Sequence, residues 1–165
     1  MFPEPFMASH ASSHALAVLA GDHKAVSQLL AEFDELASDG ADAGERNALA
    51  RQICDALTAH AVAEEGVFYP AAREALQDDD FIDDALAEHD SVRALIEQIE
   101  TLDASDERFD ALVIMLARAV AEHVKQEEGD LFPRVEAAGL DMQRLGERII
   151  RQRDETLRLL AQEAV

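Results

Sequence analysis

The sequence predicts an all-α protein, an up-down-up-down antiparallel four-helix bundle with an additional C-terminal helix. Its composition is globular and weighted toward helix-forming residues, with 48% hydrophobic and 30% charged residues and little glycine or proline. Apolar residues recur at alternating steps of three and four, as along the seam of a helix bundle. A two-helix unit also occurs twice in the chain, and four helices joined by short loops stack side by side.

The first two helices are expected on either side of a break over residues 38–44, which contains two glycines. Ser12 or Ser13 is the predicted N-cap of the first helix. Pro70 predicts a kink near the end of the second. The two seams are Leu16, Leu19, His23, Val26, Leu30 and Phe33, and then Leu49, Ile53, Leu57, His60, Glu64 and Val67.

The remaining helices follow similar signals. Residues 78–80 are three aspartates, which supply a cap and dipole-compatible charge for a third helix. A fourth helix is expected from near Ser105 to Pro133, which repeats the kink signal, and an amphipathic helix is expected from about Asp141 to Glu163. Their seams are Ile82, Ala85, His89, Val92, Ile96 and Ile99; Phe109, Leu112, Leu116, Ala119, His123 and Glu127; and Leu145, Ile149, Gln152, Thr156 and Leu159.

We expect one domain, because 165 residues suffice for a single core and no linker-like stretch interrupts them. Residues 1–11 are predicted to be an irregular N-terminal segment and residues 12–137 the four-helix bundle. Residues 138–165 are predicted to be a C-terminal helix that packs on the bundle or on a partner. A homodimer or a protein partner bound through this helix is therefore one expectation.

Charge and cysteine content exclude several classes of function. The net charge of −21 repels phosphate backbones and anionic membrane surfaces, so neither nucleic acid nor a membrane is an expected partner. We find no export signal and no run of about 18 apolar residues. Cys54 is the only cysteine, which excludes an intrachain disulfide and a zinc-thiolate cluster. A reducing cytoplasm is the expected location.

One passage occurs twice in the sequence. In residues 60–70 and again in residues 123–133, a histidine, two glutamates, a glycine, an aromatic residue and a proline fall at identical offsets. An acidic residue followed by histidine, at positions 22–23 and again at 88–89, precedes each copy. Four of the six histidines belong to this repeat, and histidine with carboxylate recurring at helical spacing is how a bundle builds a metal site.

The spacing brings these groups together in a folded bundle. His60 and Glu64 are four residues apart, as are His123 and Glu127, so each pair lies on one helix face about one turn apart. The midpoint of His23 and His60 falls in the first predicted loop, and that of His89 and His123 falls beside the third, so each hairpin is expected to bring its two histidines level.

Six ligands are natural for two metal ions, with a carboxylate from each long helix bridging the pair. The alternative is a metal-free bundle, but burying four imidazoles and two carboxylates without compensation costs several kcal/mol per unpaired ion. Spacing alone does not choose iron, because imidazole and carboxylate also suit Zn, Mn, Ni or Cu. The predicted ligands are His23, His60, Glu64, His89, His123 and Glu127.

This pattern resembles the hemerythrin-like family, also called the HHE cation-binding domain, over about residues 12–137. The family has a histidine on the first and third helices and His-x-x-x-Glu on the second and fourth, as in this sequence. The resemblance implies a centre of two non-haem iron ions, completed by an oxo, hydroxo or water bridge; Zn and Mn stay open as alternatives. It implies binding of O2, NO or peroxide for sensing, storage or detoxification.

The sequence departs from the oxygen carriers of this family at Arg93, where they have a fifth histidine. This change favours open coordination positions over a dedicated carrier. Glu65 and Glu128 are possible outer-shell or alternative ligands, and Glu128 could replace Glu127 in the ligand set. Tyr69 is a possible redox-active phenol or donor, although its counterpart, Phe132, favours a packing role.

The alternatives to small-molecule binding are a peroxide-consuming, catalase-like di-iron oxidoreductase and an iron-storage or iron-responsive interaction module. No catalytic residue is assigned for the enzymatic alternative. His10 and His14 are expected to form a solvent-exposed pair, and Cys54 is expected to be a small core residue.

Overall fold

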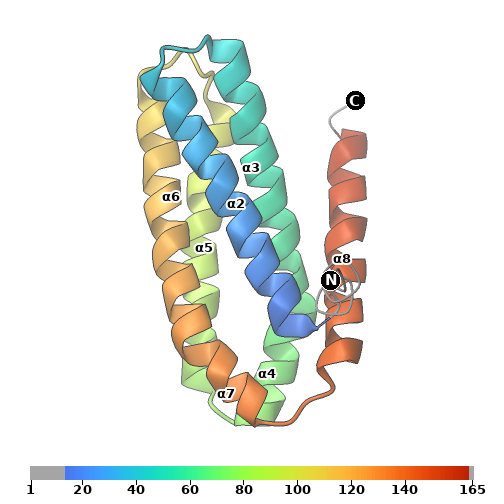
Figure 1. Ribbon diagram of the computed structural model, residues 1–165. Coiled ribbons are helices and arrows are strands. Elements are labelled where there is room, and N and C mark those ends of the chain that lie inside the picture. The colour runs from blue at the N-terminus through green and yellow to red at the C-terminus, as the bar shows by residue number, and fades with distance from the viewer. Residues whose placement is uncertain (1–13, 164–165) are drawn as a thin grey trace, which may run out of the picture.

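The computed structural model describes residues 14–163, which form a helical bundle without a β-strand in this range (Figure 1). Four long helices alternate in direction: α2 (Ala15–Ser38), α3 (Ala43–Ala63), α5 (Asp79–Thr101) and α6 (Arg108–Gln126). A fifth long helix, α8 (Met142–Glu163), lies beside them. The predicted fold class is therefore confirmed. None of the described helices is both long and apolar enough to cross a membrane.

Helices α3 and α6 do not stop at the predicted kinks. Each continues into a five-residue π-helical turn, η1 (Glu64–Phe68) or η2 (Glu127–Leu131), and then into a short helix, α4 (Tyr69–Leu76) or α7 (Phe132–Ala137). Pro70 and Pro133 lie in the first turn of these short helices. A proline in a helix removes one backbone hydrogen bond and clashes with the carbonyl four residues earlier. The widened turn before each proline accommodates both effects.

The observed start of one helix follows the sequence prediction, and the starts of two others differ from it. Asp78 caps α5 by accepting a hydrogen bond from the backbone N–H of Phe81 at 3.2 Å, as predicted. Helix α2 begins after His14, whose side chain makes no capping bond; the predicted caps and the irregular segment 1–11 lie outside the described residues. Helix α6 begins at Arg108, later than predicted, because the Asp103 carboxylate holds the N–H and hydroxyl of Ser105 in a local turn.

The apolar core consists of two clusters. One includes Leu19, Phe68, Leu131 and Ile149, and the other includes Phe33, Ile53, Phe109 and Leu116. Along each of the four chain segments that form the bundle, with η1 and η2 counted as continuations of α3 and α6, the seam histidine falls between buried residues of one cluster and buried residues of the other. A polar layer therefore crosses the bundle between two apolar packing regions.

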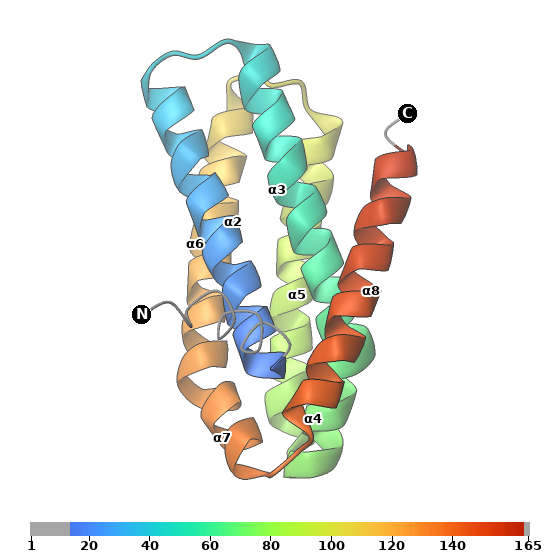
Figure 2. The same ribbon diagram turned by 45° about the vertical axis from the view of Figure 1, so that its right-hand side comes forward.

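Helix α8 covers α2 and α3 and crosses the bundle obliquely (Figures 1 and 2). Its buried residues are Leu145, Gly146 and Ile149, all in its first half. Leu159, on the same predicted side of the helix, is 46% exposed. The second half of α8 therefore contributes no buried residue to the core of this chain.

Candidate metal centre

The polar layer brings all six predicted ligands together. Each of the four long helices of the bundle supplies one histidine, and each π-helical turn supplies a glutamate as its first residue. All six side chains are buried, and the two glutamates are 0% and 3% exposed. Burial of this many ionisable groups requires strong mutual compensation. The residues are His23, His60, Glu64, His89, His123 and Glu127.

The histidines pair as the loop midpoints predicted. The ring centroids of His23 and His60 are 4.8 Å apart, and those of His89 and His123 are also 4.8 Å apart. Each pair joins the two helices of one hairpin. The level placement of the two histidines is therefore a direct result of the duplicated unit.

The donor atoms fall into two groups, in each of which they lie within 4.8 Å of one another. The first group consists of His23, His60, Glu64 and Glu127. The second group consists of Glu64, His89, His123 and Glu127. Both glutamates belong to both groups, which is the arrangement that two bridging carboxylates require.

The chemistry of these atoms fits a metal ion. Four buried donor atoms have no hydrogen-bond partner among the described residues, and all four belong to the first group: Nε2 of His23 and His60, Oε2 of Glu64 and Oε1 of Glu127. Nε2 of His23 is 3.2 Å from Oε1 of Glu127, close enough for an ion pair but not aligned as a hydrogen bond. Buried polar atoms rarely lack partners. Imidazole nitrogen and carboxylate oxygen are ligands that first-row transition metals prefer.

An outer shell of four carboxylates orients the imidazoles. Every Nδ1 has a carboxylate partner, so every Nε2 is directed into the two groups. Glu65 and Glu128 thus lie in the outer shell, and the structure places Glu127, not Glu128, among the inner donors. The pairs are His23 with Glu128 at 2.6 Å, His60 with Asp22 at 3.0 Å, His89 with Glu65 at 2.8 Å and His123 with Glu88 at 2.8 Å.

Sequence reasoning missed the roles of Asp22 and Glu88. A signal was present, because each directly precedes a seam histidine in its half of the repeat. Each contacts the histidine of the neighbouring helix, not the one beside it in the chain. Only the positions of the helices relative to one another reveal that exchange.

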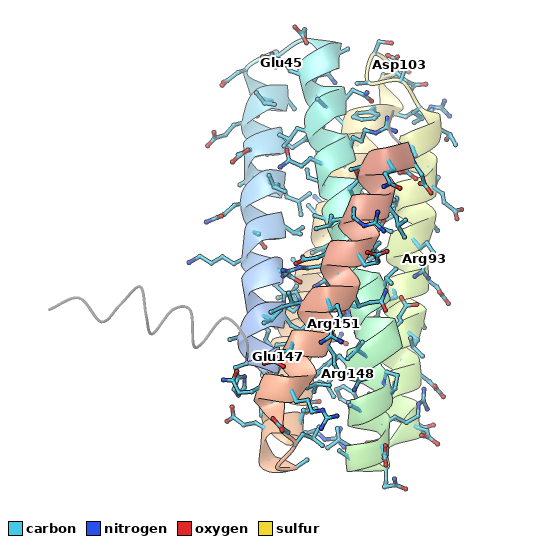
Figure 3. The ribbon with its side chains drawn as sticks, turned by 90° about the vertical axis from the view of Figure 1, so that its right-hand side faces the viewer. Glu45, Arg93, Asp103, Glu147, Arg148 and Arg151 are labelled. Atoms are coloured by element: carbon cyan, nitrogen blue, oxygen red, sulfur yellow. The ribbon has the colours of Figure 1, made fainter. Side chains whose placement is uncertain are left out.

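Two arginines contact this outer shell. Arg153 on α8 lies 2.8 Å from Asp22, and Arg93 on α5 lies 2.8 Å from Glu65. Both arginines point from the outside toward the layer, and Figure 3 shows Arg93 at the edge of α5. Each inner group therefore has one histidine whose carboxylate partner is itself paired with an arginine.

Tyr69 enters the site because of the π-helical turn. It follows Glu64 by five residues, and its backbone N–H donates to the Glu64 carbonyl across the wide turn. Its hydroxyl donates to Oε2 of Glu127 at 2.6 Å and lies 3.0 Å from Nε2 of His89. The residue is 2% exposed, but a packing role alone, which its counterpart Phe132 favoured, does not describe this polar contact.

At His60 and His123, attraction by nearby carboxylates outweighs the effect of burial on the pKa. Burial opposes protonation of His60, but attraction by Glu64 and the hydrogen bond with Asp22 raise its pKa to about 10. At His123 burial is likewise outweighed by the carboxylates of Glu127 and Glu64, which lie 3.2 Å and 3.7 Å from Nε2, and the pKa rises to about 11. Burial would raise the pKa of Glu64, but His60 holds it well below its usual range. In the metal-free layer, attraction between imidazoles and carboxylates therefore takes the place of a bound cation.

A small cavity of about 100 Å³ lies against the four histidines. Apart from these histidines, Thr58 and Arg93, its walls are apolar, and no carboxylate lines it. Its volume exceeds the ~30 Å³ that one water molecule occupies in the liquid. The remaining wall residues are Leu57, Ala61, Val62, Val92, Ile96, Val120 and Val124.

Other residues considered from the sequence lie away from the layer. His14 precedes α2 and is half-buried, and His10 lies outside the described residues. Cys54 is 1% exposed within an apolar cluster, which agrees with the expected core role. Burial, followed by the charges of Glu100 and Asp55, raises the pKa of its thiol to about 12.

Comparisons with known proteins agree with this geometry. Residues 14–135 match the protein family described as the hemerythrin HHE cation binding domain. A DNA nickase from Nostoc sp. is 41% identical over 81 residues, which are 49% of this chain and 23% of that protein. The chain thus spans less than a quarter of the length of this curated relative. No solved structure matches the chain.

Proposed function

Because the chain belongs to the hemerythrin HHE cation-binding family, we propose that it binds two iron ions and uses them to bind O2, NO or peroxide. Sensing, storage or detoxification of such molecules is the proposed role. The first group and the second group would each hold one ion, and the two shared glutamates would bridge them. Iron held by these residues would supply reversible one-electron chemistry.

The observation that carries this proposal is the convergence of donors in a buried layer. The two groups share both glutamates, and four donor atoms of the first group have no hydrogen-bond partner among the described residues. The outer carboxylates support the same conclusion, because they hold all four imidazoles with Nε2 directed inward. Their negative charge also offsets the charge that two cations would add to the buried layer.

The class of ligand is proposed from the cavity beside the histidines. Its apolar walls and small volume suit a molecule of two or three heavy atoms. The chain's own residues would exclude bulk water and larger substrates there. Arg93 stands where a further histidine would occupy a coordination position, and its guanidinium is engaged by Glu65 and Asp90 instead.

Consumption of peroxide is the second candidate function, and the absence of a fifth histidine at position 93 favours it. With only four histidines and two shared glutamates in the two groups, the site would leave room for an exogenous ligand. We assign no catalytic residue to this activity. Turnover of H2O2 by the iron-loaded protein, absent in a His60→Ala variant, would support an enzymatic role over simple binding.

The experiment that tests the main proposal is anaerobic iron loading followed by metal analysis and absorption spectroscopy. We expect about two iron ions per chain and a spectrum that changes on exposure to O2, NO or peroxide. His60→Ala should lower the iron content, whereas the control His14→Ala, outside the layer, should leave it unchanged. Iron content below about one per chain in the wild-type protein would refute the ligand assignment.

The nicking activity named for the Nostoc relative is not proposed for this chain. A net charge of −21 opposes contact with a phosphate backbone. We propose that nucleic acid is not a partner. A gel-shift assay at low salt, where electrostatic binding is strongest, should show no complex.

A further inference from the structure

Tyr69 is the only tyrosine in the chain, and its phenol oxygen lies among the donors of the second group. Each residue of that group has a donor atom within 3.4 Å of this oxygen. Among residues 14–163, no other side chain contacts all four of these residues through one atom. The four atoms are Oε2 of Glu127 at 2.6 Å, Nε2 of His89 at 3.0 Å, Oε1 of Glu64 at 3.2 Å and Nε2 of His123 at 3.4 Å.

Metal binding requires neutral imidazoles, and in that state a single phenol cannot satisfy this environment by hydrogen bonding. The Nδ1 atoms of His89 and His123 are engaged by Glu65 and Glu88, so in their neutral forms the Nε2 atoms present lone pairs. Two imidazole lone pairs and two carboxylate oxygens then face one oxygen that carries one proton. A cation among them would satisfy all four donors at once, and the phenol oxygen would be a fifth.

The two halves of the repeat differ at this position. The counterpart of Tyr69 is Phe132, whose ring stacks on His23 with centroids 6.0 Å apart. The first group therefore has no phenol, and its donor atoms are the ones that lack partners. The duplication gives two similar groups, and one hydroxyl makes them unequal.

We propose that the phenolate oxygen of Tyr69 is a ligand of the ion held by the second group. This inference rests on the proposed function and deepens it. When Tyr69 binds, the oxygen lone pair forms the metal–oxygen bond and the phenol proton is released to solvent, with no change in the oxidation state of the metal. Tyrosine is an established ligand of iron in proteins. The ion of the first group then keeps the open position for the small molecule.

Spectroscopy of the ferric protein tests this assignment without a variant. Because the chain has one tyrosine, every phenolate signal must come from Tyr69. We expect a visible phenolate-to-iron charge-transfer band and, on excitation into it, resonance Raman modes of a metal-bound phenolate ring. Iron binding should also release one more proton per chain in the wild-type protein than in Tyr69→Phe.

Tyr69→Phe reproduces the residue of the other half, so we expect it to retain two iron ions per chain and to lose the band. Phe132→Leu is the matched control, which changes the equivalent position of the other half and should keep the band. A wild-type protein that binds two iron ions without phenolate modes would overturn the inference and leave the proposed function intact. A wild-type protein that takes up no iron would overturn both, and metal analysis of the same sample distinguishes the two results.

Discussion

Arg93 contacts His89 through a single carboxylate oxygen, because Oε2 of Glu65 lies 2.8 Å from Nη2 of Arg93 and 2.8 Å from Nδ1 of His89. The arginine draws negative charge away from this oxygen, so the imidazole is a weaker electron donor than it would be with Glu65 alone.

Arg93→Gln should therefore stabilise the ferric state and lower the reduction potential of the iron-loaded protein. A tenfold shift in a one-electron equilibrium corresponds to about 59 mV. A spectroelectrochemical titration measures this change, and Arg118→Gln, an exposed arginine on α6, is the control. An unchanged or raised potential in Arg93→Gln would contradict the coupling.

Removal of an outer carboxylate should weaken metal binding without removing a ligand. Glu88→Gln keeps the size of the side chain but weakens the hydrogen bond to Nδ1 of His123. Loss of such a partner costs about 10-fold to 100-fold in metal affinity. Competition with a chelator measures the effect, and Glu97→Gln, exposed on the same helix, should match the wild-type protein. Equal affinities for both variants would show that the outer shell is dispensable.

The metal-free protein should lose stability as the pH rises above neutrality. The pKa values of His60 and His123 are raised from 6.5 to about 10 and about 11, so the folded state holds protons that the unfolded state releases. Their contribution is complete below about pH 6.5 and is lost as the pH rises through the folded values.

Urea denaturation of the metal-free protein at pH 6 and pH 9 checks this direction. In the metal-loaded protein the imidazoles are already neutral, so the same change of pH should have a smaller effect there. A metal-free protein that is more stable at pH 9 than at pH 6 would refute the prediction.

Cys54 should resist alkylation in the native protein. Its thiol is buried, and its pKa of about 12 leaves almost no thiolate at neutral pH. Labelling with iodoacetamide, followed by mass spectrometry, should be slow in buffer and fast in denaturant. Rapid labelling of the folded protein would indicate that the α3 seam opens near this residue.

The fold was predictable because its signals are periodic. Steps of three and four placed the seams, and the distance of each histidine from its loop placed the pairs at one level. The π-helical turns were not predictable in the same way. Pro70 indicated an irregularity, but only the packed structure shows that the helix widens without breaking and that Tyr69 faces the layer as a result.

The inner ligands were predictable from spacing within one helix, as for His60 and Glu64. The outer shell was not predictable, because Asp22 and Glu88 contact histidines on a neighbouring helix. The order of residues in the sequence does not specify which neighbouring helix each one contacts. The exposed end of α8 is a related case. Its pattern is amphipathic throughout, but an amphipathic face is buried only where another element lies against it, and at Leu159 none does.

The contact between Arg153 and Asp22 connects α8 to the metal centre. Asp22 is shared, because one of its oxygens lies 2.8 Å from Arg153 and the other lies 3.0 Å from His60. Binding of an ion by His60 and packing of α8 on the bundle are then energetically coupled through Asp22, and such coupling is reciprocal. Whatever detaches this helix changes the affinity for the ion, and the ion in turn sets how firmly the helix is held.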